Sequence, residues 1–336
     1  MFSRTLRLTS LLGIEVRLDP TLLVIAVLIG WTFHVRFSPT HGVTIAAVMA
    51  AAGTFLFFGS ILVHELAHGV EARHRGILVH GITLFLFGGV TEMEAHGHRP
   101  RDEFAIAAVG PWASLVCGAA FGLVATGTQV LPAAVGQPVA DVAGLLGWLN
   151  VALALFNVVP GAPLDGGRLL RAGLWWLLRS RSRAITITSR IGQALGLALA
   201  GLGVWLLVSF SAALIGALWY VLVGVFLFGA ARGELRSARL DEAWSSTTVL
   251  DLFPGLHTRG LEALVGDPRA LPTVATDADV HTLVDAFRDH DVVLISSSGQ
   301  PVTTLSEREV ARRLATLRRR PRRSSTRAEA IPAGDR

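Results

Sequence analysis

The chain has 336 residues, of which 51% are apolar and only 16% are charged, and its mean hydropathy is +0.53. This balance argues against an ordinary soluble enzyme, rules out a disordered or collagen-like chain, and indicates a polytopic membrane protein with some soluble material. The single cysteine, Cys117, excludes a disulfide framework and a thiolate zinc cluster. The net charge of +5 fits a membrane protein with a positive inner side better than a nucleic-acid-binding protein.

Long stretches without charged residues predict a polytopic α-helical membrane protein with about six transmembrane helices. A segment of residues 1–19 precedes the first stretch and contains Glu15 and Asp19, which argues against a cleavable signal peptide. We therefore expect residues 1–19 to be an N-terminal cytoplasmic segment and residues 20–235 to be the membrane core. The six predicted spans are roughly 20–36, 43–64, 104–128, 142–163, 188–208 and 211–231.

The placement of the arginines predicts the orientation of these spans. Arginines precede the first span, follow the sixth, and occur between the second and third and between the fourth and fifth. The loops on the opposite side, near 37–42, 127–141 and 209–211, contain none. By the positive-inside rule, we expect a multi-pass protein of the plasma membrane with both termini in the cytoplasm.

Two apolar segments are too short to be spans. Residues 77–90 end in a glycine pair and predict a short re-entrant or strand-like element at the cytoplasmic interface. Residues 169–178 contain Trp175 and Trp176 and are flanked by arginines, which predicts an interfacial amphipathic helix.

Near the inner end of the second predicted span lies His64-Glu65-Leu66-Ala67-His68, an HExxH pattern. Residues four apart share one face of a helix, so both imidazoles can reach one metal ion. Glu65 points to a neighbouring angle, where it can accept a proton from an attacking water. The pattern also occurs by chance, but ionisable groups within a span are costly and functional by default, so a purely structural role is the weaker alternative.

A catalytic zinc site needs a third protein ligand, and the candidate is Asp165. It is the first charged residue after a run of 23 uncharged ones. The second and fourth spans run in the same direction, and the helical rise places His64 and Asp165 at about the same depth. The surrounding prolines and glycines predict a broken helix, which is tolerated at membrane depth where it lines a polar cavity. The alternative is that Asp165 only caps a helix end in a loop.

Several motifs together resemble the site-2 protease family of zinc intramembrane metalloproteases. HELAHGVEARHRG resembles the first motif of that family, and NVVPGAPLDGGR resembles its second. ITLFLFGGV is similar to the re-entrant segment of the family, AAVGPWASL to its Gly-Pro motif, and GIEVRLDPTLL to its N termini. The resemblance covers about residues 10–235. It implies that His64, His68 and Asp165 bind one Zn²⁺ per chain, that Glu65 is the general base and later the proton donor, and that Asn157 donates a hydrogen bond to the oxyanion.

Two features set this chain apart from parts of that family. Many members have Asn shortly after the Gly-Pro pair, where this chain has Ser114. We expect this difference to affect the packing of the third span or the binding of substrate, and not the binding of zinc. The loops are also too short for an inserted PDZ-like domain, so the re-entrant segment, the spans or the C-terminal domain would control substrate access.

The composition becomes that of a soluble domain over residues 241–317, followed by an Arg-rich tail, 318–336, that we expect to be disordered and either solvated or in contact with anionic lipid. Residues 274–314 read strand, helix, strand, turn, strand, helix, which is similar to a CBS module, a small α/β fold that senses adenosine nucleotides. Residues 247–253 would be its opening segment. CBS modules usually act in pairs, so one repeat would pair through a homodimer. Binding of an adenine nucleotide and a structural or partner-binding role are both open.

The leading hypothesis is an intramembrane zinc endopeptidase that cleaves a membrane-anchored protein within or next to its transmembrane helix. The resemblance implies regulated intramembrane proteolysis in the lipid bilayer, with an anti-sigma factor or a signal-peptide remnant as substrate. A metal transporter and a catalytically inactive membrane scaffold are the alternatives. The position of His64 and Asp165 near one membrane face disfavours transport, and the intact HExxH pattern disfavours an inactive scaffold.

Overall fold

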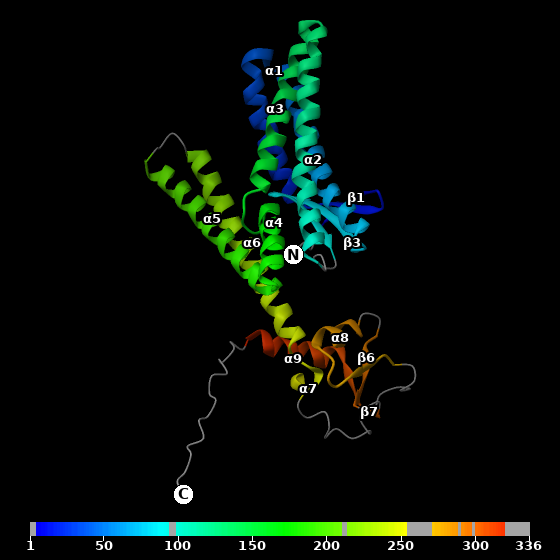
Figure 1. Ribbon diagram of the computed structural model, residues 1–336. Helices are drawn as coiled ribbons and strands as arrows, with labels where there is room; N and C mark the ends of the chain where they lie inside the picture. Colours follow the sequence, from blue (N-terminus) through cyan, green and yellow to red (C-terminus); the bar gives the residue numbers. More distant parts are fainter. Residues whose placement is uncertain are drawn as a thin grey trace. The chain divides into compact units, whose positions relative to one another are not determined.

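A computed structural model of the protein describes residues 5–93, 99–209, 214–253, 271–287, 290–297 and 300–319. The chain forms two compact units, Met1–Leu235 and Arg236–Arg336. Figure 1 shows that the first unit holds the long helices and one small sheet, and that the second unit holds shorter helices around another sheet.

The first unit is built mainly from helices, because apolar segments of this length must satisfy their backbone hydrogen bonds internally in a bilayer. Within the described residues, five helices are long and apolar enough to cross a membrane, namely α1, α2, α3, α5 and α6. The shorter α4 lies between α3 and α5 in the sequence. The bounds are α1 Thr21–His74, α2 Pro100–Gly127, α3 Ala133–Asn157, α4 Asp165–Leu178, α5 Arg181–Ser209 and α6 Leu214–Ser245.

Helix α1 consists of two antiparallel helical segments, here called legs, which are joined at Gly42. Gly42 has φ 76° and ψ 163°, which is not helical. Residues on the two sides of it meet: a Cβ atom at Gly53 would lie 3.1 Å from the Phe33 ring, and one at Gly30 would lie 3.5 Å from Thr54 Oγ1. The five long helices therefore supply six apolar legs, and the predicted helical membrane fold is confirmed.

Helix α3 differs from the predicted fourth span, 142–163, at both ends. It begins at Ala133, directly after Pro132, so Asp141, which suggested a boundary, lies inside the helix, where its Oδ2 is 2.7 Å from His41 Nε2. It ends at Asn157, because Pro160, Gly161 and Pro163 cannot continue a regular helix.

A four-stranded sheet of order β1-β2-β3-β4 packs against the part of α1 that follows Gly42. β2 and β3 are parallel, and the other two pairs are antiparallel. β3 and β4 confirm the predicted strand-like element, whereas the strands of the N-terminal segment were not predicted. Ile14, Ile82 and Leu84 of the sheet are buried with Ile61 of α1. The bounds are β1 Leu6–Leu11, β2 Ile14–Leu18, β3 Val79–Phe85 and β4 Gly88–Met93.

The second unit has its own apolar core, formed around a three-stranded sheet of order β5-β6-β7. The elements from β5 onward follow the predicted order of strand, helix, strand, strand and helix. The predicted opening segment forms α7, whose Val249 and Leu252 are buried in this core. The predicted tail lies outside the described residues from 320 onward. The bounds are α7 Val249–Leu252, β5 Thr273–Ala275, α8 Val280–Asp285, β6 Val292–Ser297, β7 Gln300–Ser306 and α9 Glu307–Arg319.

Candidate active site

The part of α1 that follows Gly42 carries both histidines of the HExxH pattern on one buried face. His64 is 4% exposed and His68 is 3% exposed. Their Nε2 atoms lie 3.2 Å apart, as the spacing of one helical turn predicts.

Asp165 reaches the same point from the start of α4. A short loop joins the end of α3 at Asn157 to Asp165, so the helix is broken here, as the prolines and glycines predicted. This loop packs against glycines without room for a side chain: a Cβ atom at Gly192 would lie 1.9 Å from the carbonyl oxygen of Ala162, and one at Gly166 would lie 2.2 Å from that of Val158. These close approaches hold the loop, and with it Asp165.

The three side chains form a compact group whose geometry suits one metal ion. Asp165 Oδ2 lies 3.1 Å from His64 Nε2 and 3.2 Å from His68 Nε2. Tetrahedral zinc with bonds of about 2.0–2.1 Å would place neighbouring ligand atoms about 3.3 Å apart. Two imidazoles and one carboxylate are also a known donor set for catalytic zinc, which keeps a fourth position open.

The two oxygens of the Asp165 carboxyl group face different partners. Oδ2 lies within 3.2 Å of the Nε2 atoms of both histidines. The second oxygen, Oδ1, lies 4.0 Å from Arg168 Nη1. The carboxyl group thus presents Oδ2 to the histidines and Oδ1 to a cation.

The other ring nitrogen of each histidine has a partner on α2. His68 Nδ1 lies 2.6 Å from the carbonyl oxygen of Ile106, and His64 Nδ1 lies 2.9 Å from Ser114 Oγ. A carbonyl only accepts, so His68 carries its proton on Nδ1 and offers the lone pair of Nε2. The Ser114 hydroxyl can donate or accept, so its contact holds the His64 ring without fixing which nitrogen carries the proton. This contact places Ser114 beside a metal-ligand candidate, whereas we expected an effect on packing or substrate.

Gly110 lies directly against the ligand group. A Cβ atom at this position would be 2.2 Å from His68 Nε2 and 2.7 Å from His64 Nε2. The absence of a side chain is therefore a condition of the site, because even a methyl group would occupy the space in front of the ligand atoms.

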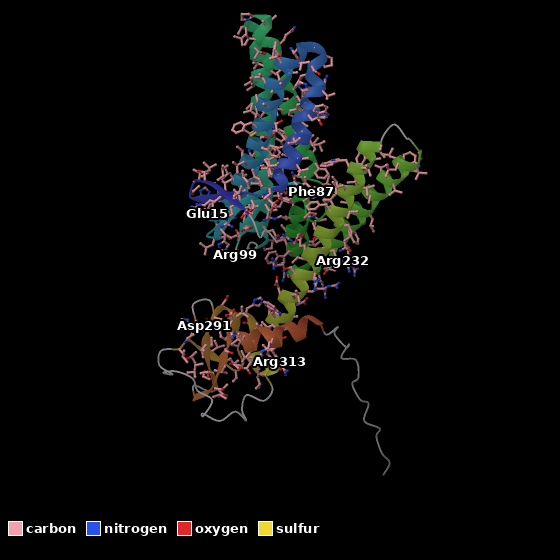
Figure 2. The ribbon with its side chains drawn as sticks, turned by 180° about the vertical axis from the view of Figure 1, so that it is seen from behind. Glu15, Phe87, Arg99, Arg232, Asp291 and Arg313 are labelled. Carbon is pink, nitrogen blue, oxygen red and sulfur yellow. The ribbon has the colours of Figure 1, made fainter. Side chains whose placement is uncertain are left out.

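Glu65 is covered by the β3–β4 hairpin. Thr91 Oγ1 lies 2.8 Å from Glu65 Oε2, and a Cβ atom at Gly89 would lie 2.4 Å from Glu65 Cγ. The turn of the hairpin also contacts α6. The ring of Phe87 in the turn (labelled in Figure 2) stacks on the ring of Phe226 in α6, with centroids 4.0 Å apart. Glu65 is 9% exposed beneath this cover.

Asn157 does not join this group in the structure. It is the last residue of α3 and half-buried, and its side-chain Nδ2 donates to the carbonyl oxygen of Leu153 at a distance of 3.0 Å. Within the described residues, no hydrogen bond links it to the metal-ligand candidates.

Comparison with known proteins gives a family match. The model of peptidase family M50 matches residues 52–141 and 128–199, and these ranges contain the two histidines, Glu65 and Asp165. Residues 52–199 of the chain thus match peptidase family M50.

The M50 relatives include proteins named as zinc metalloproteases. The chain is 36% identical over 255 residues to sll0528 of Synechocystis sp., covering 74% of this chain and 64% of that protein. It is 38% identical over 245 residues to Rip3 of Mycobacterium tuberculosis, covering 71% of this chain and 61% of that protein. The chain thus spans somewhat less than two thirds of these relatives. A solved structure of a site-2 protease from Methanocaldococcus jannaschii is 27% identical, with a TM-score of 0.48, over 69% of this chain and 95% of that one.

Four residues of this M50 centre were not recognised from the sequence as parts of it. Gly110 and Gly89 stand inside motifs that the resemblance had singled out, so their positions were available as a signal. Ser114 was noticed only as a departure from the family pattern. Thr91 follows the hairpin motif directly, and nothing in the sequence connects it with Glu65.

Proposed function

We propose that the protein is an intramembrane zinc endopeptidase of the site-2 protease type. The observation that carries the proposal is the buried group of His64, His68 and Asp165, whose ligand atoms are spaced as zinc requires, with Glu65 adjacent to His64 on α1. Metal bound there would lie within a unit that has six apolar helical legs. The bond to be cleaved would therefore be in or next to a transmembrane segment.

The residues fit the metal in number, chemistry and support. Two neutral imidazoles and one carboxylate supply three ligands, and partners on α2 fix the outer nitrogens of both imidazoles. When bound, zinc supplies a Lewis acid that polarises the scissile carbonyl and lowers the pKa of water to about 7.

Glu65 and Asn157 perform the remaining chemistry in this proposal. Glu65 takes the proton of the attacking water and later delivers it to the leaving amine. Asn157 has two N–H groups on its side chain, and one of them donates to Leu153. The second N–H is available to the substrate carbonyl, where a donor stabilises the developing negative charge.

The substrate in this proposal is a protein with a transmembrane helix, in the bilayer that surrounds the six legs. The peptide bonds of a helix are not accessible to a protease, so we expect residues that weaken the helix near the cleaved bond. By family resemblance, an anti-sigma factor or a signal-peptide remnant is the substrate class, and the plasma membrane with cytoplasmic termini is the location. An adenine nucleotide or a second copy of the chain would act through the second unit.

The decisive experiment compares wild type with Glu65→Gln on transmembrane trial substrates, with the purified full chain in detergent. We expect wild type to cleave at least one substrate, and Glu65→Gln to retain zinc and lose cleavage by at least about a hundredfold. Glu71→Gln is the matched control, because Glu71 lies on the same helix and pairs with Arg75. A zinc-loaded wild type that cleaves nothing would favour the inactive scaffold, and metal flux into liposomes would favour the transporter.

A further inference from the structure

Strand β4 places one hydroxyl group on the Glu65 carboxylate. Thr91 Oγ1 lies 2.8 Å from Glu65 Oε2 and 3.2 Å from the backbone carbonyl oxygen of Glu65. Both acceptors belong to the same residue and neither can donate, so the Thr91 hydroxyl must donate its single proton to Glu65.

The register of the sheet explains why Thr91 stands there. Thr91 pairs with Ile82 and Gly89 pairs with Leu84, and both partners in β3 are buried against α1. Residues two apart in a strand share a face, so positions 89 and 91 both point at α1. Gly89 leaves space for the Glu65 side chain, and Thr91 supplies the hydrogen bond.

The methyl group of Thr91 has a separate role. A Cβ atom at Gly69 would lie 3.7 Å from Thr91 Cγ2, at van der Waals distance. Gly69 is one helical turn after Glu65, so the methyl group lies beside the same face of α1 as the hydroxyl. The hydroxyl and the methyl can therefore be removed one at a time, because valine keeps the branched shape and serine keeps the hydroxyl.

We propose that Thr91 is a positioning residue that fixes the Glu65 carboxylate for proton transfer. Its hydroxyl donates to Oε2 and holds the carboxylate in one orientation, with Oε1 as the oxygen that accepts the proton. A glutamate has three rotatable side-chain bonds, and without this hydrogen bond its carboxylate would sample several orientations beside the metal. The inference rests on the proposed function, and it assigns to Thr91 no contact with substrate or metal.

The test compares Thr91→Val, Thr91→Ser and a control, Thr83→Val, in the zinc-loaded full chain. Thr83 lies in β3 of the same hairpin and is 1% exposed, and among the described residues its hydroxyl has no hydrogen-bond partner. The control thus makes the same chemical change at a buried position where no hydrogen bond is lost.

We expect Thr91→Val to lower kcat by about tenfold to a hundredfold, as for the loss of a hydrogen bond to a charged group, with KM and zinc content unchanged. Thr91→Ser restores most of kcat, and Thr83→Val keeps the wild-type value. A packing role alone would give the opposite order, with serine worse than valine. Wild-type kcat in Thr91→Val would overturn the inference.

A second readout does not depend on cleavage. The infrared difference between wild type and Glu65→Gln isolates the carboxylate stretch of Glu65. We expect this band to shift in Thr91→Val and to stay in place in Thr91→Ser and Thr83→Val. An unshifted band overturns the inference whatever the activity, whereas a shifted band in a wild type without activity supports the hydrogen bond and refutes only the proposed function.

Discussion

The replacement Gly110→Ala tests the geometry of the metal centre with one methyl group. The added Cβ atom would lie 2.2 Å from His68 Nε2 and 2.7 Å from His64 Nε2, whereas an ordinary contact needs at least about 3.4 Å. At least one imidazole must therefore retreat by about 1 Å, while metal–ligand distances tolerate changes of only about 0.2 Å. Because the loss of an outer-shell partner alone costs about 10- to 100-fold in metal affinity, we expect a loss of more than a hundredfold here.

The assay is zinc affinity of the purified full chain, measured by competition with a chelator. Gly122→Ala is the matched control: it lies on the same helix, and a Cβ atom there would have no neighbour within 4 Å. The control should keep the wild-type affinity and gain up to about 1 kcal/mol of helix stability. A folded Gly110→Ala protein with wild-type zinc affinity would refute the assignment of this point as the metal position.

Three further replacements test the surroundings of the centre and the second unit. Ser114→Ala should weaken zinc binding by about 10- to 100-fold, whereas Ser60→Ala, a buried serine bonded only within α1, should not, as chelator competition will show. Gly89→Ala should keep zinc and lose cleavage, because its Cβ atom would lie 2.4 Å from Glu65 Cγ; unchanged cleavage rates would contradict the described hairpin contact. Asp279→Ala removes the side-chain N-cap of α8 and should destabilise it by about 1 kcal/mol, measured by faster amide exchange in α8 of the full chain.

The sequence was sufficient to predict those residues of the centre whose positions depend on local helical periodicity. The spacing of His64 and His68 needs only a helix to bring both imidazoles to one face. Asp165 was found because a charge after a long apolar run is conspicuous. The prolines and glycines before Asp165 predicted a broken helix, and α3 does end at Asn157, before Asp165 begins α4.

The remaining features depend on contacts between segments far apart in the chain. Ser114 meets His64 because α2 packs on α1, and Thr91 meets Glu65 because β4 folds over α1. The antiparallel packing at Gly42 and the pairing of the N-terminal strands with β3 are likewise tertiary. Neither hydrophobic runs nor motif spacing contains this information, so it required the folded structure.

Zinc content of the purified chain tests the central claim most directly, because it requires no knowledge of the substrate. Wild type is compared with His64→Ala, His68→Ala and Asp165→Ala, and with His74→Ala, an exposed histidine of the same helix, as control. We predict about one zinc per wild-type and control polypeptide, as for a catalytic site with three protein ligands, and sharply reduced zinc in each of the other three variants. A wild type that holds no zinc after metal is supplied, or an Asp165→Ala protein with unchanged zinc content and affinity, would contradict the account.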